Sequence, residues 1–262
     1  ANTHFDSAAV RRLARNFADP AVGGVCGNQR HHRQRSADSS GEGEKLYWSY
    51  DKWIKALESR TGSIVAADGA IYAIRRTLFR VPESAAATDD FAISTAVIDQ
   101  GSRLVYEPAA VAYEEALGEA RGEFDRKVRI MTRGWQGVLL RRRLLDPRRS
   151  GFYAVVLFSH KVLRRLAPNL IVLFFAASWA AAPRQPFYAA MALLQTLFYA
   201  LALAGGLLKR SGAGRRRLLY APFFFVLANA AALVAVGRLL CGRRIESWQP
   251  HRAGGGMSLP SR

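Results

Sequence analysis

The sequence predicts an α/β globular part followed by an all-α membrane section. Up to about residue 145, short strand-like apolar pieces alternate with segments of helical periodicity. Three later stretches lack any charged residue and approach the length that spans a bilayer: 167–182, 187–208 and 218–237. The chain has 262 residues, half of them apolar, which leaves room for both parts.

Charge is distributed unevenly along the chain. The formal net charge is +18, but residues 1–120 carry 14 Lys and Arg against 16 Asp and Glu, whereas residues 121–262 carry 24 against 4. The excess therefore lies beside or between the apolar stretches, as is typical of segments that face anionic lipid. This pattern indicates a lipid bilayer as partner and no nucleic acid. Cys26 and Cys241 alone predict neither a disulfide framework nor a metal cluster.

The first predicted elements are short. Apolar spacing predicts a helix over residues 8–17 and a strand over residues 22–27. The polar stretch 28–43 is interpreted as a surface loop or hairpin. His31 and His32 in this stretch are of a type that ligates metals, but adjacent histidines favour solvated loop positions.

A longer helix is predicted over residues 44–59. Its apolar stripe recurs at three- and four-residue steps, and we expect it to face the core: Tyr47, Tyr50, Ile54 and Leu57. Trp48 and Trp53 lie off this stripe, where partial burial is the simpler expectation and stacking on a sugar ring or a lipid headgroup is the functional one.

Residues 63–76 predict a strand, a turn and a second strand, with Asp68-Gly69 at the turn. Glycine at a strand end lets the backbone come close to a ligand, although an ordinary Asp-Gly turn has the same sequence. Further along, strand-like segments 103–106 and 109–113 flank Pro108.

Asp89 and Asp90 open another predicted helix, with Thr88 suited to its N-cap and Gly101 to its end. Acidic residues stabilise any first helical turn, so the pair has a structural explanation beside a catalytic one. In the catalytic interpretation a carboxylate takes a proton from a substrate hydroxyl. Consecutive helical residues point roughly 100° apart, so at most one of the two carboxylates can face an acceptor.

A helix that begins at Glu123 is predicted to be amphipathic. One side is apolar and expected to face the core, and the other is basic: Phe124, Val128, Met131, Trp135 and Val138 against Arg126, Arg129 and Arg133. The basic side suits either a diphosphate or phospholipid headgroups.

The membrane section is predicted to contain three spanning helices over residues 167–240, after a basic interfacial segment at 146–166 and before a polar tail at 241–262. Arginines within 141–149 and at 164–165 place the start of the first span in the cytoplasm. The basic residues between 209 and 217 place the loop after the second span there too. Arg243 and Arg244 then fall on the disfavoured side, so the side of the tail stays open.

Five segments together resemble the membrane-bound branch of family 2 glycosyltransferases, which includes cellulose, poly-N-acetylglucosamine and hyaluronan synthase-like enzymes. They follow the order typical of that family and cover nearly the whole chain: 17–27, 62–76, 89–91, 123–136 and 159–164. The resemblance implies a GT-A-like fold for residues 1–145, as the carboxy-terminal part of a cytoplasmic catalytic domain.

The same resemblance implies roles for the residues of the predicted Asp-Gly turn and of the predicted helix N-terminus. Asp90 takes the place of the general base that deprotonates the acceptor hydroxyl, and Asp89 that of a residue that caps, positions or contacts the acceptor. Asp68 and Gly69 match the segment that lines the cleft for donor and acceptor.

Three further residues are assigned through the family's other elements. Arg126 and Arg129 stand in the place of a Gln-x-x-Arg-Trp element and are expected to bind diphosphate. Ile130 replaces its tryptophan, which disfavours processive synthesis. Asn2 corresponds to part of a metal-binding Asp-x-Asp element whose leading Asp is missing, so we expect the chain alone not to turn over a nucleotide sugar.

The implied function is that of an inverting glycosyltransferase (hexosyltransferase type) in polysaccharide biosynthesis. It would move a sugar from a nucleotide-sugar donor to a membrane-associated glycan or a lipid-linked acceptor, with Mg²⁺ or Mn²⁺ at the donor diphosphate. The implied location is the bacterial inner membrane, with the catalytic part cytoplasmic. The alternative is a catalytically silent membrane scaffold that keeps the fold. A transporter is disfavoured because no apolar stretch carries an interior charge.

Overall fold

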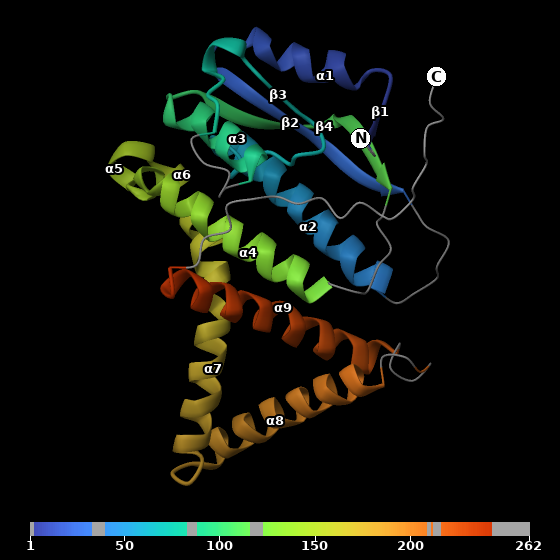
Figure 1. Cartoon of the computed structure of the whole chain (residues 1–262), viewed down its shortest axis with the longest axis vertical. Coiled ribbons are helices and arrows are strands. Elements are labelled where there is room, and N and C mark those ends of the chain that lie inside the picture. The colour runs from blue at the N-terminus through green and yellow to red at the C-terminus, as the bar shows by residue number, and fades with distance from the viewer. Residues whose placement is uncertain are drawn as a thin grey trace, which may run out of the picture.

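A computed structural model describes residues 3–32, 40–82, 88–115, 123–208, 211 and 216–242. A globular part is built on one sheet, and long apolar helices extend from it (Figure 1). The elements in chain order are β1 (Thr3–Phe5), α1 (Ala9–Arg15), η1 (Asn16–Ala18), β2 (Val22–His32), α2 (Ser40–Thr61), β3 (Tyr72–Ile74), η2 (Arg76–Leu78), α3 (Asp89–Asp99), β4 (Arg103–Glu115), α4 (Glu123–Leu140), η3 (Arg142–Leu145), α5 (Pro147–Ser150), α6 (Phe152–Leu157), η4 (Phe158–Leu163), α7 (Arg164–Ala181), α8 (Pro186–Leu207) and α9 (Arg217–Leu240).

The sheet is mixed, with the strand order β1-β4-β2-β3. β2 and β4 run parallel, and β1 and β3 add to them antiparallel. The two strands predicted on either side of Pro108 form one strand, β4. The register of β4 with β2 shifts at this point, from Cys26↔Tyr106 to Asn28↔Val111. The side-chain amide of Asn28 donates a hydrogen bond to the Pro108 carbonyl (3.0 Å) and so pairs one polar group of the irregular stretch.

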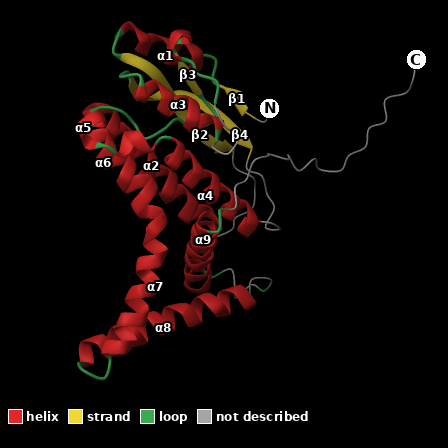
Figure 2. Cartoon of the chain, turned by 60° about the vertical axis from the view of Figure 1, so that its left-hand side comes forward, coloured by secondary structure: helices red, strands yellow, loops and turns green. Residues whose placement is uncertain are grey.

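Helices cover both faces of the sheet. α1 packs on one face, while α2, α3 and α4 lie on the other side (Figures 1 and 2). The core beneath α1 consists of small and branched residues: Ala9, Leu13, Val22, Val25, Ile71, Val105, Ala110 and Ala112. A second cluster fills the opposite face: Cys26, Ile64, Ala67, Leu104 and Tyr106.

The face of α2 that packs against the core differs from the apolar stripe predicted by the helical period. Of the predicted apolar stripe, Tyr50 is 60% exposed and Leu57 is 40% exposed, Ile54 is half-buried, and the Tyr47 side chain lies outside the described residues. Lys55 and Glu58 are buried instead, so the prediction that the stripe faces the core was wrong for Tyr50 and Leu57. Buried charged groups are tolerated only when they are paired, and their partners come from distant segments, which a periodic pattern cannot show.

The strand predicted before Asp68 was also wrong, since within residues 63–76 only β3 is a strand. Ile64, Val65 and Ala67 are buried without pairing as a strand. Their backbone N–H groups donate instead to the carbonyl of Leu104 (2.8 Å), the carboxylate of Glu58 (3.2 Å) and the hydroxyl of Ser94 (3.1 Å). We call residues 63–71 the anchored loop.

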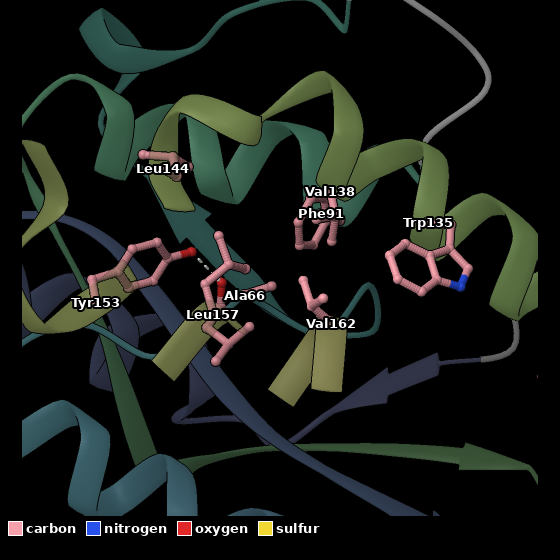
Figure 3. Packing of buried hydrophobic residues seen from close by; sticks show 9 residues of the cluster. Ala66, Phe91, Trp135, Val138, Leu144, Tyr153, Leu157 and Val162 are labelled. Carbon is pink, nitrogen blue, oxygen red and sulfur yellow. Dashed lines mark hydrogen bonds between the residues drawn. The ribbon is translucent and has the colours of Figure 1, made fainter. Parts of the chain in front are cut away.

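The apolar stretches form helices that are long and apolar enough to cross a membrane: Phe152–Ala181, Pro186–Leu207 and Leu218–Leu240. The first includes α6 and η4, so residues 152–166, the larger part of the segment 146–166 that was predicted as interfacial, continue directly into α7. A shared core joins this helix to the globular part, with Tyr153, Leu157 and Val162 packed near Phe91 of α3 and Trp135 of α4 (Figure 3).

α9 packs against both α8 and α4. Where it meets α8, a β-carbon on Gly205 would lie 2.3 Å from the carbonyl oxygen of Leu219, so the close approach of the two helices requires a glycine there. Where it meets α4, the ammonium of Lys127 lies 4.5 Å from the centre of the Phe224 ring. The third apolar helix is thereby attached to the globular part.

Candidate functional site

The N-terminus of α3 faces the anchored loop. Thr88 occupies the N-cap in an extended conformation, as expected, although its side chain makes no capping hydrogen bond. Asp89 is exposed, while Asp90 is half-buried and its Oδ1 accepts the N–H of Phe91 (2.8 Å). A β-carbon placed on Gly69 would lie 3.4 Å from Oδ2 of Asp90. The structure thus brings together two of the predicted site residues, Gly69 and Asp90.

Tyr72, at the start of β3, adds a phenol group to the surroundings of Asp89 and Asp90. It is half-buried. Burial raises its pKa, and the nearby negative charges of Asp90 and Asp89 raise it further. The hydroxyl therefore stays protonated near both carboxylates and is able to donate a hydrogen bond. Tyr72 was not among the predicted site residues, because a tyrosine in a predicted strand has no distinguishing local signal.

A buried lysine holds the anchored loop on α2. The ammonium of Lys55 lies 2.6 Å from Oδ2 of Asp68 and 2.7 Å from Oδ2 of Asp51. Burial by itself lowers the pKa of Lys55, but the negative charges of Asp68 and Asp51 outweigh burial and raise it above its usual value. Asp68, predicted to line the substrate cleft, is thus engaged by a lysine of the same chain.

The thiol of Cys26 completes this attachment. Its Sγ accepts the backbone N–H of Asp68 (3.3 Å), and the residue is fully buried in β2. Burial, helped by the negative charge of Asp68, raises the pKa of the thiol to about 12. Cys26 therefore remains a neutral thiol that helps position the loop and is not a nucleophile.

Glu58 connects α2 to the helix that enters the membrane section. Its Oε2 accepts the N–H of Val65 (3.2 Å), and its Oε1 lies 3.4 Å from Nδ1 of His160 in η4. The Glu58 side chain is only 8% exposed. Burial raises its pKa to about 7, so a proton on this carboxyl group is gained or lost near neutral pH.

Lys161, the next residue of η4, faces the N-terminus of α3. Its ammonium lies 5.8 Å from the centre of the Phe91 ring. Burial lowers the pKa of this ammonium to about 8, helped by the positive charges of Arg165 and Lys55, while the negative charges of Asp68 and Asp90 act in the opposite direction. The segment 159–164 was part of the family resemblance, but no role was predicted for Lys161, because its position beside Phe91 depends on how the helix packs.

α4 carries the predicted arginines. The expected apolar face is confirmed, since Val128, Trp135 and Val138 are buried. Arg129 is half-buried, and its side chain pairs with neither Asp68 nor Asp90 within the described part of the chain. The side chain of Arg126 lies outside the described residues. Diphosphate binding by these two arginines therefore stays a prediction.

The expected metal site lies at the start of the chain, and Asn2 falls outside the described residues. Within residues 3–32, 40–82, 88–115, 123–208 and 216–242, no three His, Cys, Asp or Glu side chains come together in a way that could hold a metal ion. The described residues thus do not by themselves form a site for a resident metal ion.

Comparison with known proteins identifies the fold. No family model and no curated protein matches the chain. Among solved structures, the chain is similar to the mannosyltransferase PcManGT from Pyrobaculum calidifontis in complex with GDP-Man and Mn²⁺, with a TM-score of 0.58 and 20% sequence identity. The match covers 91% of this chain and 59% of the length of that chain. The mixed sheet with its helices is therefore a glycosyltransferase-like fold.

Proposed function

We propose that this protein is an inverting glycosyltransferase that moves a sugar from a nucleotide-sugar donor to a membrane-associated glycan or lipid-linked acceptor. The observation that carries the proposal is the position of Asp90 at the N-terminus of α3, where its carboxylate faces the side of Gly69 that lacks a side chain. The likeness of the fold to a mannosyltransferase supports it. So do the apolar helices that share a core with this site.

In the proposed reaction Asp90 is the general base. Its carboxylate takes the proton of the acceptor hydroxyl as that oxygen attacks the anomeric carbon of the donor sugar. The bond between this carbon and the phosphate oxygen breaks, and its electron pair leaves with the nucleoside diphosphate. Because attack comes from the face opposite the leaving group, the configuration at the anomeric carbon inverts. Asp89 is proposed to position the acceptor.

The proposal extends to the surroundings of the reaction. Residues 1–145 form the carboxy-terminal part of a GT-A-like catalytic domain on the cytoplasmic side, and residues 167–240 span the membrane. A divalent cation, Mg²⁺ or Mn²⁺, would neutralise the leaving diphosphate when bound. The presence of Mn²⁺ and GDP-Man in the mannosyltransferase complex supports this class of donor and cation.

The test uses the full-length protein in isolated membranes, with a panel of nucleotide sugars and both Mg²⁺ and Mn²⁺. Release of nucleoside diphosphate is compared between the parent and Asp90→Asn. The matched control is Asp99→Asn, the same substitution at the other end of α3, where Asp99 pairs with Arg149 (3.0 Å).

We expect release from one donor, abolished in Asp90→Asn and retained in Asp99→Asn. The anomeric configuration of the product, determined by nuclear magnetic resonance, then tests inversion. If well-expressed parent protein releases nucleoside diphosphate from no donor, the silent membrane scaffold becomes the better proposal.

A further inference from the structure

The helix that enters the membrane section contains a π-helical turn where it passes the candidate site. In η4 the N–H of Arg164 donates to the carbonyl of Ser159, five residues earlier, where a regular α-helix would bond four residues apart. Such turns insert a residue and rotate the side chains that follow, and they are frequent at functional sites. Here the turn includes His160 and Lys161.

The two side chains of this turn reach two different parts of the site. His160 lies against the buried carboxyl group of Glu58 (3.4 Å). Lys161 lies over the ring of Phe91, the residue that follows Asp90 in the first turn of α3. Val162, between these residues and α7, is buried in the shared core and fixes the turn against the globular part.

The two lysines at the site differ in how their charge is balanced. Lys55 is neutralised by Asp51 and Asp68, both within 2.7 Å. Lys161 makes no salt bridge within the described part of the chain and lies over the aromatic ring of Phe91. Lys161 thus contributes a positive charge that the neighbouring side chains do not neutralise by direct contact.

We propose that Lys161 binds a phosphate group of the substrate at this site, from the helix that leads into the membrane. A lysine ammonium binds phosphate as a compact positive charge with three donors. The charge-free stretch of α7 begins at residue 167, roughly 9 Å further along the helix. Lys161 therefore lies beside the first turn of α3, shortly before the stretch that is expected to enter the bilayer. The inference rests on the proposed function, which defines the substrates that contain the phosphate group.

Both substrates of the proposed reaction contain a phosphate group. The donor has a diphosphate, and a lipid-linked acceptor has a phosphate at the membrane surface. The experiment uses the full-length protein in nanodiscs and one probe for each source. Inorganic pyrophosphate represents the donor, and a polyprenyl phosphate in phosphatidylcholine represents the lipid-linked acceptor.

Binding of both probes is compared between the parent, Lys161→Met and Lys161→Arg. Methionine keeps the apolar stem that packs on Phe91 and removes the charge, whereas arginine keeps the charge. Arg149→Met is the control for loss of a basic residue, because Arg149 pairs with Asp99 at the far end of α3. Thermal unfolding of each variant verifies folding, and Lys161→Gln replaces Lys161→Met if the latter does not fold.

We expect Lys161→Met to weaken binding of one probe by about ten- to a hundredfold, the usual effect of losing a hydrogen bond to a charged group. Lys161→Arg is expected to stay within a few-fold of the parent, and Arg149→Met to bind normally. Loss of pyrophosphate binding assigns Lys161 to the donor, and loss of polyprenyl phosphate binding assigns it to the acceptor. Equal binding by parent and Lys161→Met, or no binding by the parent, overturns the inference.

Sugar transfer measured in the same preparations separates this inference from the proposed function. A parent that transfers sugar, with a KM for donor and acceptor unchanged in Lys161→Met, contradicts only the role of Lys161. A parent that binds a probe through Lys161 but transfers no sugar contradicts only the proposed transferase.

Discussion

Gly69 and Asp90 are close neighbours in the folded protein, since a β-carbon added to Gly69 would lie 3.4 Å from Oδ2 of Asp90. One residue belongs to the anchored loop and the other to the first turn of α3. The absence of a side chain on Gly69 leaves one oxygen of Asp90 open on that side, while the other oxygen accepts the N–H of Phe91. Access to this carboxylate therefore depends on Gly69.

Side chains introduced at Gly69 should reduce transfer without unfolding the protein. The methyl group of Gly69→Ala would reach van der Waals contact with Oδ2 of Asp90, and Gly69→Val would cover that oxygen further. We expect activity to fall on the order of tenfold for alanine and toward a hundredfold for valine. Unfolding free energies should change by less than about 0.5 kcal/mol for alanine.

The matched control for this prediction is Gly62→Ala, because no atom lies within 4 Å of a β-carbon at Gly62. Transfer rates and thermal unfolding are measured on all three variants. Parent-like activity in Gly69→Val would show that Gly69 does not control access to Asp90.

The stability of the protein should depend on pH through Glu58. Its folded pKa of about 7 lies above the ordinary value of 4.5. Between these two values the folded state binds more protons at Glu58 than the unfolded state, so this contribution falls as pH rises through that window. The surrounding charges act in both directions, because Asp51 raises this pKa and Lys55 and Lys161 lower it.

Glu58→Gln removes this titration and keeps an acceptor for the N–H of Val65. We expect a shallower decrease of the unfolding midpoint from about pH 5 to about pH 8 than in the parent. The measurement is thermal unfolding in detergent at a series of pH values. An identical pH dependence in parent and variant would contradict the role of Glu58.

The ion pairs of Lys55 should stabilise the protein more than the exposed ion pair of Arg149. The Lys55 side chain is 11% exposed, against 48% for Arg149. Lys55→Met leaves the carboxylates of Asp51 and Asp68 without their cation, which we expect to cost about 2–3 kcal/mol. Arg149→Met should cost less than about 1 kcal/mol. Equal losses in denaturant unfolding of the two variants would contradict the structural role of Lys55.

The hydroxyl of Tyr153 joins the first apolar helix to the anchored loop. It donates a hydrogen bond of 2.7 Å to the carbonyl of Val65 inside the shared core (Figure 3). Tyr153→Phe leaves this buried carbonyl without its donor, and we expect a loss of about 1–2 kcal/mol. Tyr50→Phe, at a tyrosine that is 60% exposed, is the control and should stay within about 0.5 kcal/mol of the parent. Thermal unfolding of both variants distinguishes the two effects.

The elements with a strong local pattern could be predicted from sequence. The first turn of α3 carries its acidic residues where the helix N-terminus stabilises negative charge. The apolar stretches form helices long enough to cross a membrane, because length and hydropathy do not depend on the rest of the fold. The apolar face of α4, with Val128 and Val138 buried, followed the expected helical period.

α2 and the anchored loop could not be predicted in this way. The core-facing side of α2 carries Lys55 and Glu58, and their burial depends on Asp68 and on the backbone of Val65. The apolar residues of the anchored loop look like a strand, yet their backbone donors are satisfied by side chains such as Ser94. A periodic pattern contains no information about such partners.

Local sequence therefore decides which segments are helical, which enter an apolar environment and where the acidic pair lies. Tertiary structure alone decides that Gly69 comes beside Asp90 and that Lys161 lies over the ring of Phe91, the next residue of α3. Helical period, capping and hydropathy are properties of neighbouring residues, whereas a site formed by a loop, a helix N-terminus and a π-helical turn depends on contacts between segments far apart in the chain.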